Sequence, residues 1–194
     1  MIGPAFPEVL AAARVRAPWA FEAIYRDLSG PVTGYLRLHG AAEPDDVASE
    51  AFISVLTGLE SFTGDEAGFR AWVFTIAHRR LVDERRRAGR RPATTDDGED
   101  ALLEHRGGDA EEDALAALGV QRVRDLCSRL SPDQRSVLLL RVLGDLTVEQ
   151  VAAVVGRSPA AVKALQRRGL LALAGDLGVE PAPPATRAAM TEAR

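Results

Sequence analysis

The sequence is poor in cysteine, in aromatic residues and in long hydrophobic runs, and each scarcity excludes something. Its one cysteine, Cys127, cannot form a disulfide within the chain. Aromatic residues make up 5% of the 194 residues against 46% hydrophobic residues, so the core is expected to be aliphatic and helical. No apolar run approaches the ~20 residues that cross a bilayer, and no charged start with a long apolar stretch resembles a signal peptide. We expect a soluble cytoplasmic protein without membrane insertion.

Residues that commonly perform catalysis or bind metals are also sparse. His39, His78, His105 and Cys127 are scattered along the chain, with neither the spacing of metal ligands nor a recognisable nucleophile motif. We therefore expect no catalytic residues, no metal and no cofactor, and an enzyme is the least favoured class.

Charge is unevenly distributed along the chain, whose formal net charge is −4. Residues 93–113 hold nine carboxylates and one arginine, a net −8, which leaves +4 for everything else. This acidic segment is poor in apolar residues, as is typical of chains that do not fold alone, so we expect a flexible linker between two modules. Directly before it, "HRRLVDERRRAGRRP" (78–92) sets seven arginines against Asp83 and Glu84.

Hydrophobic periodicity predicts helices on both sides of the linker, and no alternating strand pattern competes. Apolar residues recur at helical spacing in 21–28, 47–59, 66–91 and 115–130. We therefore expect an all-α fold: two small helical domains joined by a flexible acidic linker, the second a helix-turn-helix domain. The expected boundaries are 1–92 for the first domain, 93–113 for the linker, 114–178 for the second domain and 179–194 for a disordered tail.

Three helix starts in the second module have explicit caps. Ser131 and Thr147 each begin a capping box with a glutamine three residues later, and Ser158-Pro159 combines an N-cap with proline at the first helical position. A short turn near Gly156 separates the last two helices, as in a helix-turn-helix.

The last of these helices has an apolar and a basic side. Small residues near its start permit close approach to base edges, and Lys163 and Arg167 share one face, as in a recognition helix in a major groove. The residues that point away from the apolar stripe are Ala160, Ala161, Lys163, Ala164, Arg167 and Arg168. The alternative is a helical bundle with a solvated basic face that binds no DNA.

The arginines of residues 78–92 admit two interpretations. A solvated helix end, whose arginines favour the negative pole of the helix dipole, accounts for one or two of them. Neutralisation of phosphates accounts better for seven. Upstream, "SFTGDEAGFRAW" places a loop containing Gly64 and Asp65 beside three aromatic residues, which could receive an unstacked base. Phe69 and Trp72 are more simply interpreted as core.

Taken together, these segments resemble a bacterial sigma factor of the extracytoplasmic-function (ECF) group, over roughly residues 21–177. The first module is similar in "FEAIYRDLSGPVTGYLR", "EPDDVASEAFISVL" and "SFTGDEAGFRAWVFTIAHRRLVDERRR", and the second in "LSPDQRSVLLLRVLGDLTVEQVAAVVGRSPAAVKALQRR". The order and spacing of these motifs, with an acidic linker between them, carry the resemblance.

The resemblance implies three sets of functional residues. Those expected to bind the clamp helices of core RNA polymerase are Asp46, Glu50, Phe52 and Ile53. Those expected to contact the minus-ten element of promoter DNA, melted to a single strand, are Phe62, Thr63, Gly64, Asp65, Arg79, Arg80, Asp83, Arg86 and Arg87. Those expected to contact the minus-thirty-five element as duplex are Arg157, Ser158, Ala160, Ala161, Lys163, Ala164, Arg167 and Arg168.

The resemblance also implies an anti-sigma factor as a further partner, and a linker that runs towards the active-site cleft of the polymerase. Two departures from the family pattern stand out: Ser49 replaces the usual glutamine, and no threonine precedes Val162. The preferred promoter sequence is therefore not carried over. The main alternative is a free-standing helix-turn-helix regulator that binds duplex DNA without polymerase.

Overall fold

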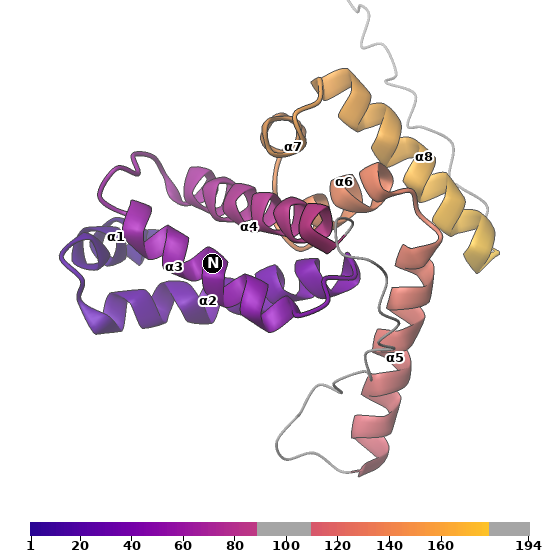
Figure 1. Cartoon of the computed structure of the whole chain (residues 1–194), viewed down its shortest axis with the longest axis horizontal. Coiled ribbons are helices and arrows are strands. Elements are labelled where there is room, and N and C mark those ends of the chain that lie inside the picture. Colours follow the sequence, from indigo (N-terminus) through magenta and orange to yellow (C-terminus); the bar gives the residue numbers. More distant parts are fainter. Residues whose placement is uncertain (89–109, 179–194) are drawn as a thin grey trace, which may run out of the picture.

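The computed structural model describes residues 1–88 and 110–178, and every regular element in these two ranges is helical (Figure 1). The expected all-α fold is confirmed. The elements are η1 (Gly3–Ala5), α1 (Phe6–Arg14), α2 (Pro18–Leu38), α3 (Pro44–Gly58), α4 (Glu66–Ala88), α5 (Ala110–Ser128), α6 (Pro132–Val142), α7 (Val148–Val155) and α8 (Pro159–Leu177).

Several boundaries differ from those expected from the sequence. The segment before α2, for which no helix was predicted, contains α1, and α2 continues through Pro31. The helix expected over residues 66–91 is described as far as Ala88, so Arg90 and Arg91 lie outside the described residues. Most of the expected linker and the whole expected tail also lie outside them, and α5 begins within the last four residues assigned to the linker.

The first module is α1 to α4, and its core is partly aromatic. Tyr35, Phe69 and Phe74 are among the largest fully buried side chains. The expectation of an aliphatic core is therefore wrong for this module, because all of the few aromatic residues of the chain precede residue 75. The second module, α5 to α8, contains no aromatic residue in its described range, and its core is aliphatic as expected.

The predicted caps of the second module are confirmed. At the start of α6, the Ser131 hydroxyl accepts from the Gln134 amide (3.3 Å) while the Gln134 side chain accepts from the Ser131 amide (3.0 Å). Thr147 and Gln150 form the same reciprocal pair at α7. Gly156 ends α7 in the left-handed conformation (φ 65°), which favours glycine, and α8 follows directly. This turn gives the helix-turn-helix.

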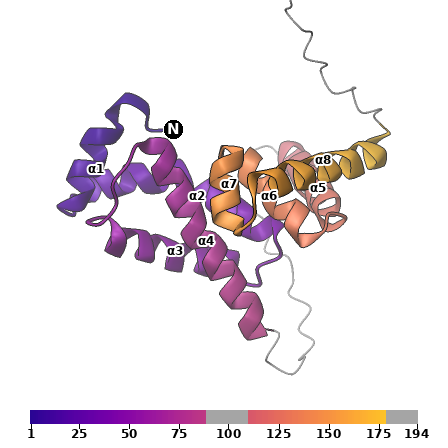
Figure 2. The same ribbon diagram turned by 90° about the horizontal axis from the view of Figure 1, so that it is seen from above.

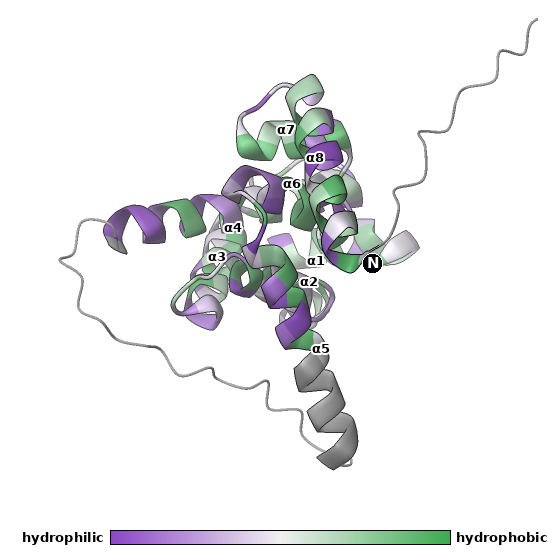
Figure 3. Ribbon diagram, turned by 90° about the vertical axis from the view of Figure 1, so that its right-hand side faces the viewer, coloured by the Kyte–Doolittle hydropathy of each residue, from purple (hydrophilic) through white to green (hydrophobic). Residues whose placement is uncertain are grey.

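The two modules are in contact. Helix α7 packs against α4 and α5 packs against α2, and the buried apolar residues of both modules form one cluster (Figures 1 and 2). The C-terminal end of α4 extends beyond this packed body and is hydrophilic (Figure 3). No helix in the described ranges is long and apolar enough to cross a membrane.

Candidate nucleic-acid and protein interfaces

The end of α4 presents a free cationic surface. Arg79, Arg86 and Arg87 are exposed, and within the described ranges no ion pair holds any of them. Asp83 lies four residues from both Arg79 and Arg87, yet within the described ranges it pairs with neither and is itself exposed. These three guanidinium groups are therefore available to neutralise phosphates. We call them the α4 arginines.

Two other arginines of α4 bind the protein itself. Arg80 donates to the Ser54 hydroxyl (2.8 Å) and pairs with Glu50 (3.3 Å), which ties α4 to α3. Arg85 donates to the backbone carbonyl of His39 and so caps the end of α2. The count of seven arginines from the sequence therefore overstates the free charge, because Arg80 and Arg85 have intramolecular partners.

The loop from Phe62 to Asp65, expected to capture a base, is only partly open to solvent. Thr63, Gly64 and Asp65 are exposed, but Phe62 is 9% exposed, with its ring stacked on Trp72 at 5.2 Å between centroids. Phe62 was expected to contact DNA; its ring faces the core in this structure, and the DNA contact stays a prediction. Gly64 has a φ of 149°, which favours glycine. The Asp65 carboxylate accepts the Gly68 amide (2.8 Å) at the start of α4.

The expected polymerase-binding residues of α3 also divide into exposed and buried side chains. Asp46, Glu50 and Ile53 are exposed, and Ile53 is 61% exposed despite being apolar. Phe52 is 3% exposed and packs on the Tyr25 ring at 4.9 Å, and its expected contact with the polymerase stays a prediction.

The sequence assignment missed the rest of this surface. Leu56 lies one turn from Ile53 and is 37% exposed, and Tyr25 on α2 is 45% exposed. Their exposure beside two carboxylates gives α3 a mixed acidic and apolar surface that is unlike a solvated helix face.

Helix α8 places the expected recognition residues on its outer side. Ala160, Lys163, Ala164, Arg167 and Arg168 are exposed, and Ala161 is half-buried. Val162 and Gly169 are buried on the inner side. The exposed group offers three cations next to small side chains, as a helix in a major groove requires.

The two remaining residues of the minus-thirty-five set have structural partners. Ser158 is the N-cap of α8, where its hydroxyl accepts the Ala161 amide at 3.2 Å. Arg157 pairs with Asp133 on α6 at 2.7 Å, with both side chains about half exposed. Such an exposed pair contributes little stability, so a phosphate could compete for Arg157.

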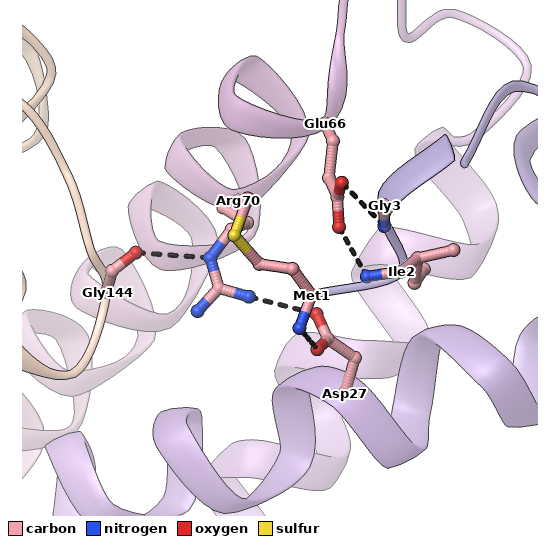
Figure 4. Close-up of polar contacts among 7 residues, drawn as sticks. All are labelled: Met1, Ile2, Gly3, Asp27, Glu66, Arg70 and Gly144. Atoms are coloured by element: carbon pink, nitrogen blue, oxygen red, sulfur yellow. Dashed lines mark hydrogen bonds and ion pairs between the residues drawn. The ribbon is translucent and has the colours of Figure 1, made fainter. Parts of the chain in front are cut away.

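Arg70 forms a buried polar contact between the modules. Its Nε donates to the Gly144 carbonyl of the second module (3.2 Å), and its Nη1 pairs with Asp27 on α2 (2.9 Å) (Figure 4). Nearby, the Gln150 side chain donates to the Ala67 carbonyl (3.1 Å). These contacts were not predictable from the sequence, because each joins residues more than forty positions apart.

Two histidines that are far apart in sequence lie around one tyrosine. The Tyr35 hydroxyl and His78 Nδ1 are 2.7 Å apart, and the rings of Tyr35 and His39 are 4.7 Å apart. Burial, with the nearby Arg85 charge, lowers the pKa of His39 to about 3 and also lowers the pKa of His78. Burial raises the pKa of Tyr35, opposed by a hydrogen bond with Ser136 of the second module.

The side chains of Tyr35, His39 and His78 are neutral at neutral pH and form part of the packed contact between the two modules. No group of three potential metal ligands occurs in the ranges 1–88 and 110–178.

Comparison with known proteins identifies both modules. Residues 21–91 match the family model of sigma-70 region 2, and residues 121–173 match that of sigma-70 region 4. The chain is 33% identical over 158 residues to the ECF RNA polymerase sigma factor BldN of Streptomyces coelicolor. The aligned residues cover 80% of this chain and 59% of BldN. It is 35% identical over 129 residues to the ECF RNA polymerase sigma factor ShbA of Streptomyces griseus, covering 65% of this chain and 67% of ShbA. The chain thus spans about three fifths of BldN and two thirds of ShbA.

Among solved structures, the chain is similar to CnrH in complex with the cytosolic domain of CnrY, with a TM-score of 0.62. That comparison covers 88% of this chain and 95% of the matched one at 22% identity, and it supports the fold alone.

Proposed function

Because the chain belongs to the ECF group of bacterial RNA polymerase sigma factors, we propose that it binds core RNA polymerase and directs transcription initiation from specific promoters. One observation carries the proposal. The two modules each present a cationic helix surface that has no ion-pair partner among residues 1–88 and 110–178, the α4 arginines on one and Lys163, Arg167 and Arg168 on the other. The protein has no catalytic activity of its own in this proposal and acts in the cytoplasm with the polymerase.

The α4 arginines contact the melted minus-ten strand and the adjoining duplex. Arg86 and Arg87 in the last turn of α4, with the exposed Arg79 two turns earlier, can follow a phosphate backbone. The neighbouring loop residues Thr63, Gly64 and Asp65 are exposed and take the unstacked base, while Phe62 supports them from below. A base leaves the stack most easily where the strand is already single.

Helix α8 reads the minus-thirty-five element as duplex. Its exposed alanines allow the helix to approach the groove, and Lys163 and Arg167 reach guanine edges or phosphates. The N-cap at Ser158 fixes the start of the helix, where base contacts in helix-turn-helix proteins concentrate.

The acidic and apolar surface of α3 binds the polymerase. Ile53 and Leu56 are exposed apolar side chains beside Asp46 and Glu50, the mixture expected of a surface that is covered in a complex. The solved CnrH is bound by the cytosolic domain of CnrY. We extend this to an anti-sigma partner for the present chain, which would compete for the same surface.

Function requires the two modules to separate. Two promoter elements about 25 base pairs apart are ~85 Å apart along the duplex, at about 3.4 Å per base pair. Helices α4 and α8 are 23 and 19 residues long, and α8 packs on α7, which packs on α4. Even laid end to end, at 1.5 Å per residue, the two helices would extend only about 63 Å, so the packed arrangement does not reach both elements. The contact through Arg70 therefore breaks when the protein joins polymerase and promoter.

The test is transcription by polymerase reconstituted with the purified protein on fragmented genomic DNA, followed by mapping of start sites. We expect initiation at a discrete set of positions that share two upstream motifs. Core polymerase alone serves as the control. Absence of protein-dependent initiation from any fragment would contradict the proposal, and tight operator binding unaffected by polymerase would favour a free-standing regulator.

A further inference from the structure

Helix α1 precedes the residues that match the sigma-70 region 2 model, yet it packs beneath the expected base-capturing loop. Its inner residues Phe6, Val9, Leu10 and Ala13 are all buried. The Phe6 ring lies 5.5 Å from the ring of Phe69, which in turn contacts Phe62 at 5.2 Å. The floor of the loop is therefore built jointly by α1 and α4.

The N-terminal segment also makes polar contacts at both ends of the loop. At its start, the Arg14 guanidinium donates to the backbone carbonyl of Phe62 at 2.5 Å. Just after its end, the amides of Ile2 and Gly3 donate to the Glu66 carboxylate at 2.6 and 2.9 Å (Figure 4). Three exposed residues, Thr63 to Asp65, lie between these two fixed points.

This arrangement restricts the loop backbone before DNA arrives. The Phe62 ring is held by stacking on Trp72, and its carbonyl is held by a charge-assisted hydrogen bond from Arg14, which is stronger than one between neutral groups. Restricting a loop in its bound conformation removes part of the ordering cost of binding. A loop fixed in one shape also discriminates between bases better than one that adapts to each.

We propose that Arg14 is a positioning residue for minus-ten recognition, which holds the loop from Phe62 to Asp65 in the shape that receives the unstacked base. This role rests on the function proposed above. Arg14 acts through the Phe62 carbonyl and need not touch DNA itself.

The experiment uses complete holoenzyme on promoter fragments whose minus-ten region is opened by mismatches, with each base of the exposed strand varied in turn. Arg14→Ala removes the hydrogen bond, and Arg14→Lys keeps the charge with a less extended donor group. Arg26→Ala is the control, because Arg26 is exposed on α2 and pairs only with Glu22. Affinity is measured for every base at every position.

We expect Arg14→Ala to reduce discrimination between the best and worst base by about fivefold to tenfold at one position, in proportion to one lost charge-assisted hydrogen bond. Arg14→Lys should recover part of that loss, and Arg26→Ala should lose no discrimination between bases. Binding to an isolated minus-thirty-five duplex should be unchanged in all variants. A loss of stability alone would weaken binding of every base equally, so the position-specific loss separates positioning from folding.

A spectroscopic measurement reports on the loop directly. In a Trp19→Phe background, the remaining tryptophan is Trp72, which stacks on Phe62. Arg14→Ala should change the fluorescence of Trp72 in the free protein, and Arg26→Ala should leave it unchanged.

The outcomes separate the two proposals. If wild-type holoenzyme shows no base preference on the opened fragments, the minus-ten half of the proposed function fails and the role of Arg14 fails with it. If wild type shows a preference and Arg14→Ala retains it in full, the positioning role alone is overturned. Should Arg14→Ala fold poorly, Arg14→Lys with unchanged discrimination and unchanged Trp72 fluorescence would overturn it equally.

Discussion

Helices α4 and α8 both carry exposed basic residues, but the two helices arrange these residues differently relative to their buried side chains. In α4 the separation runs along the helix: Phe69, Arg70 and Phe74 are buried in its first half, and the α4 arginines are exposed towards its end. In α8 the separation runs around the axis: the exposed Lys163 directly follows the buried Val162, and the exposed Arg168 directly precedes the buried Gly169.

This difference decides how far charge and folding can be altered independently. The end of α4 extends beyond the packed body, so its charges can change without touching the core (Figure 3). On α8, Lys163 directly follows the buried Val162. Gly169 follows Arg168 directly, and a Cβ there would lie 2.8 Å from Leu138 Cδ1, closer than packing allows.

Reversing two of the α4 arginines tests this contrast most severely. We expect Arg86→Glu with Arg87→Glu to reduce promoter opening at least about a hundredfold, because two phosphate contacts become repulsive. Stability and core polymerase binding should be nearly unchanged, since both side chains are exposed. Permanganate footprinting of the melted strand measures opening. The control is Arg26→Glu with Arg122→Glu, at two exposed arginines of α2 and α5. Normal promoter opening by Arg86→Glu with Arg87→Glu would refute the role assigned to the α4 arginines.

Arg70 tests the buried half of the same helix. Arg70→Ala leaves the Gly144 carbonyl without its donor and leaves Asp27 with only the Met1 amino group. Breaking a buried pair is costly, and we expect a loss of about 3 kcal/mol in the free energy of unfolding. Urea denaturation measures this loss, with Arg26→Ala as the exposed control.

The same substitution should increase the separation of the modules, because Arg70 joins them. Energy transfer between dyes on α3 and α8 would detect the change. An undiminished transfer efficiency in a folded Arg70→Ala protein would show that the apolar contact between α4 and α7 suffices.

The outer face of α8 tests the other side of the comparison. Lys163→Ala with Arg167→Ala should weaken binding of the minus-thirty-five duplex by about 2 kcal/mol and reduce its salt dependence. Both side chains are exposed, so unfolding should be unaffected even though the core is adjacent. Quantitative footprinting upstream of the start site measures the loss against Arg122→Ala. An unchanged upstream footprint would argue against α8 as the recognition helix.

A smaller effect is expected from pH, which should change the stability of the folded protein through the buried histidines beside α4. His78 on α4 contacts Tyr35, which packs on His39, and burial holds the pKa of His39 at about 3 in the folded protein. The unfolded chain protonates this histidine as pH falls through about 6.5, while the folded protein does not. Stability is therefore fully present above about pH 6.5 and decreases below it, by about 1 kcal/mol from His39 between pH 7 and 5.5.

Urea denaturation over this pH range measures the slope, and His39→Gln should flatten it. The lowered pKa of His78 acts in the same direction. Stability that stays constant down to pH 5.5 would mean that His39 is accessible to protons in the folded protein.

Local features of the fold were predictable, and long-range ones were not. The caps at Ser131, Thr147 and Ser158 depend on residues three positions apart, so the sequence suffices to recognise them. Helix α1 was not predicted, although its apolar residues Phe6, Val9, Leu10 and Ala13 have helical spacing. Its nine residues do not reveal that it packs against α2 or that Arg14 donates to the distant Phe62 carbonyl.

The candidate surfaces show the same limit. Phe52 and Phe62 were assigned to partner contacts, and both are buried, because an apolar residue on an amphipathic helix or loop fits a core as well as an interface. Arg80 and Arg85 could not be told from their neighbours Arg86 and Arg87, since only the placement of α3 and the end of α2 supplies their partners.

The sequence by itself determined the helical class, the capped helix-turn-helix and the family, because these depend on periodicity, capping residues and the order of motifs. Tertiary structure alone decided which arginines remain free, which aromatic residues form the core, and that the two modules are joined through Arg70. The physical reason is that exposure and pairing belong to a side chain only once distant segments have packed around it. Charge density in a sequence is therefore an upper limit on the charge that a surface can present.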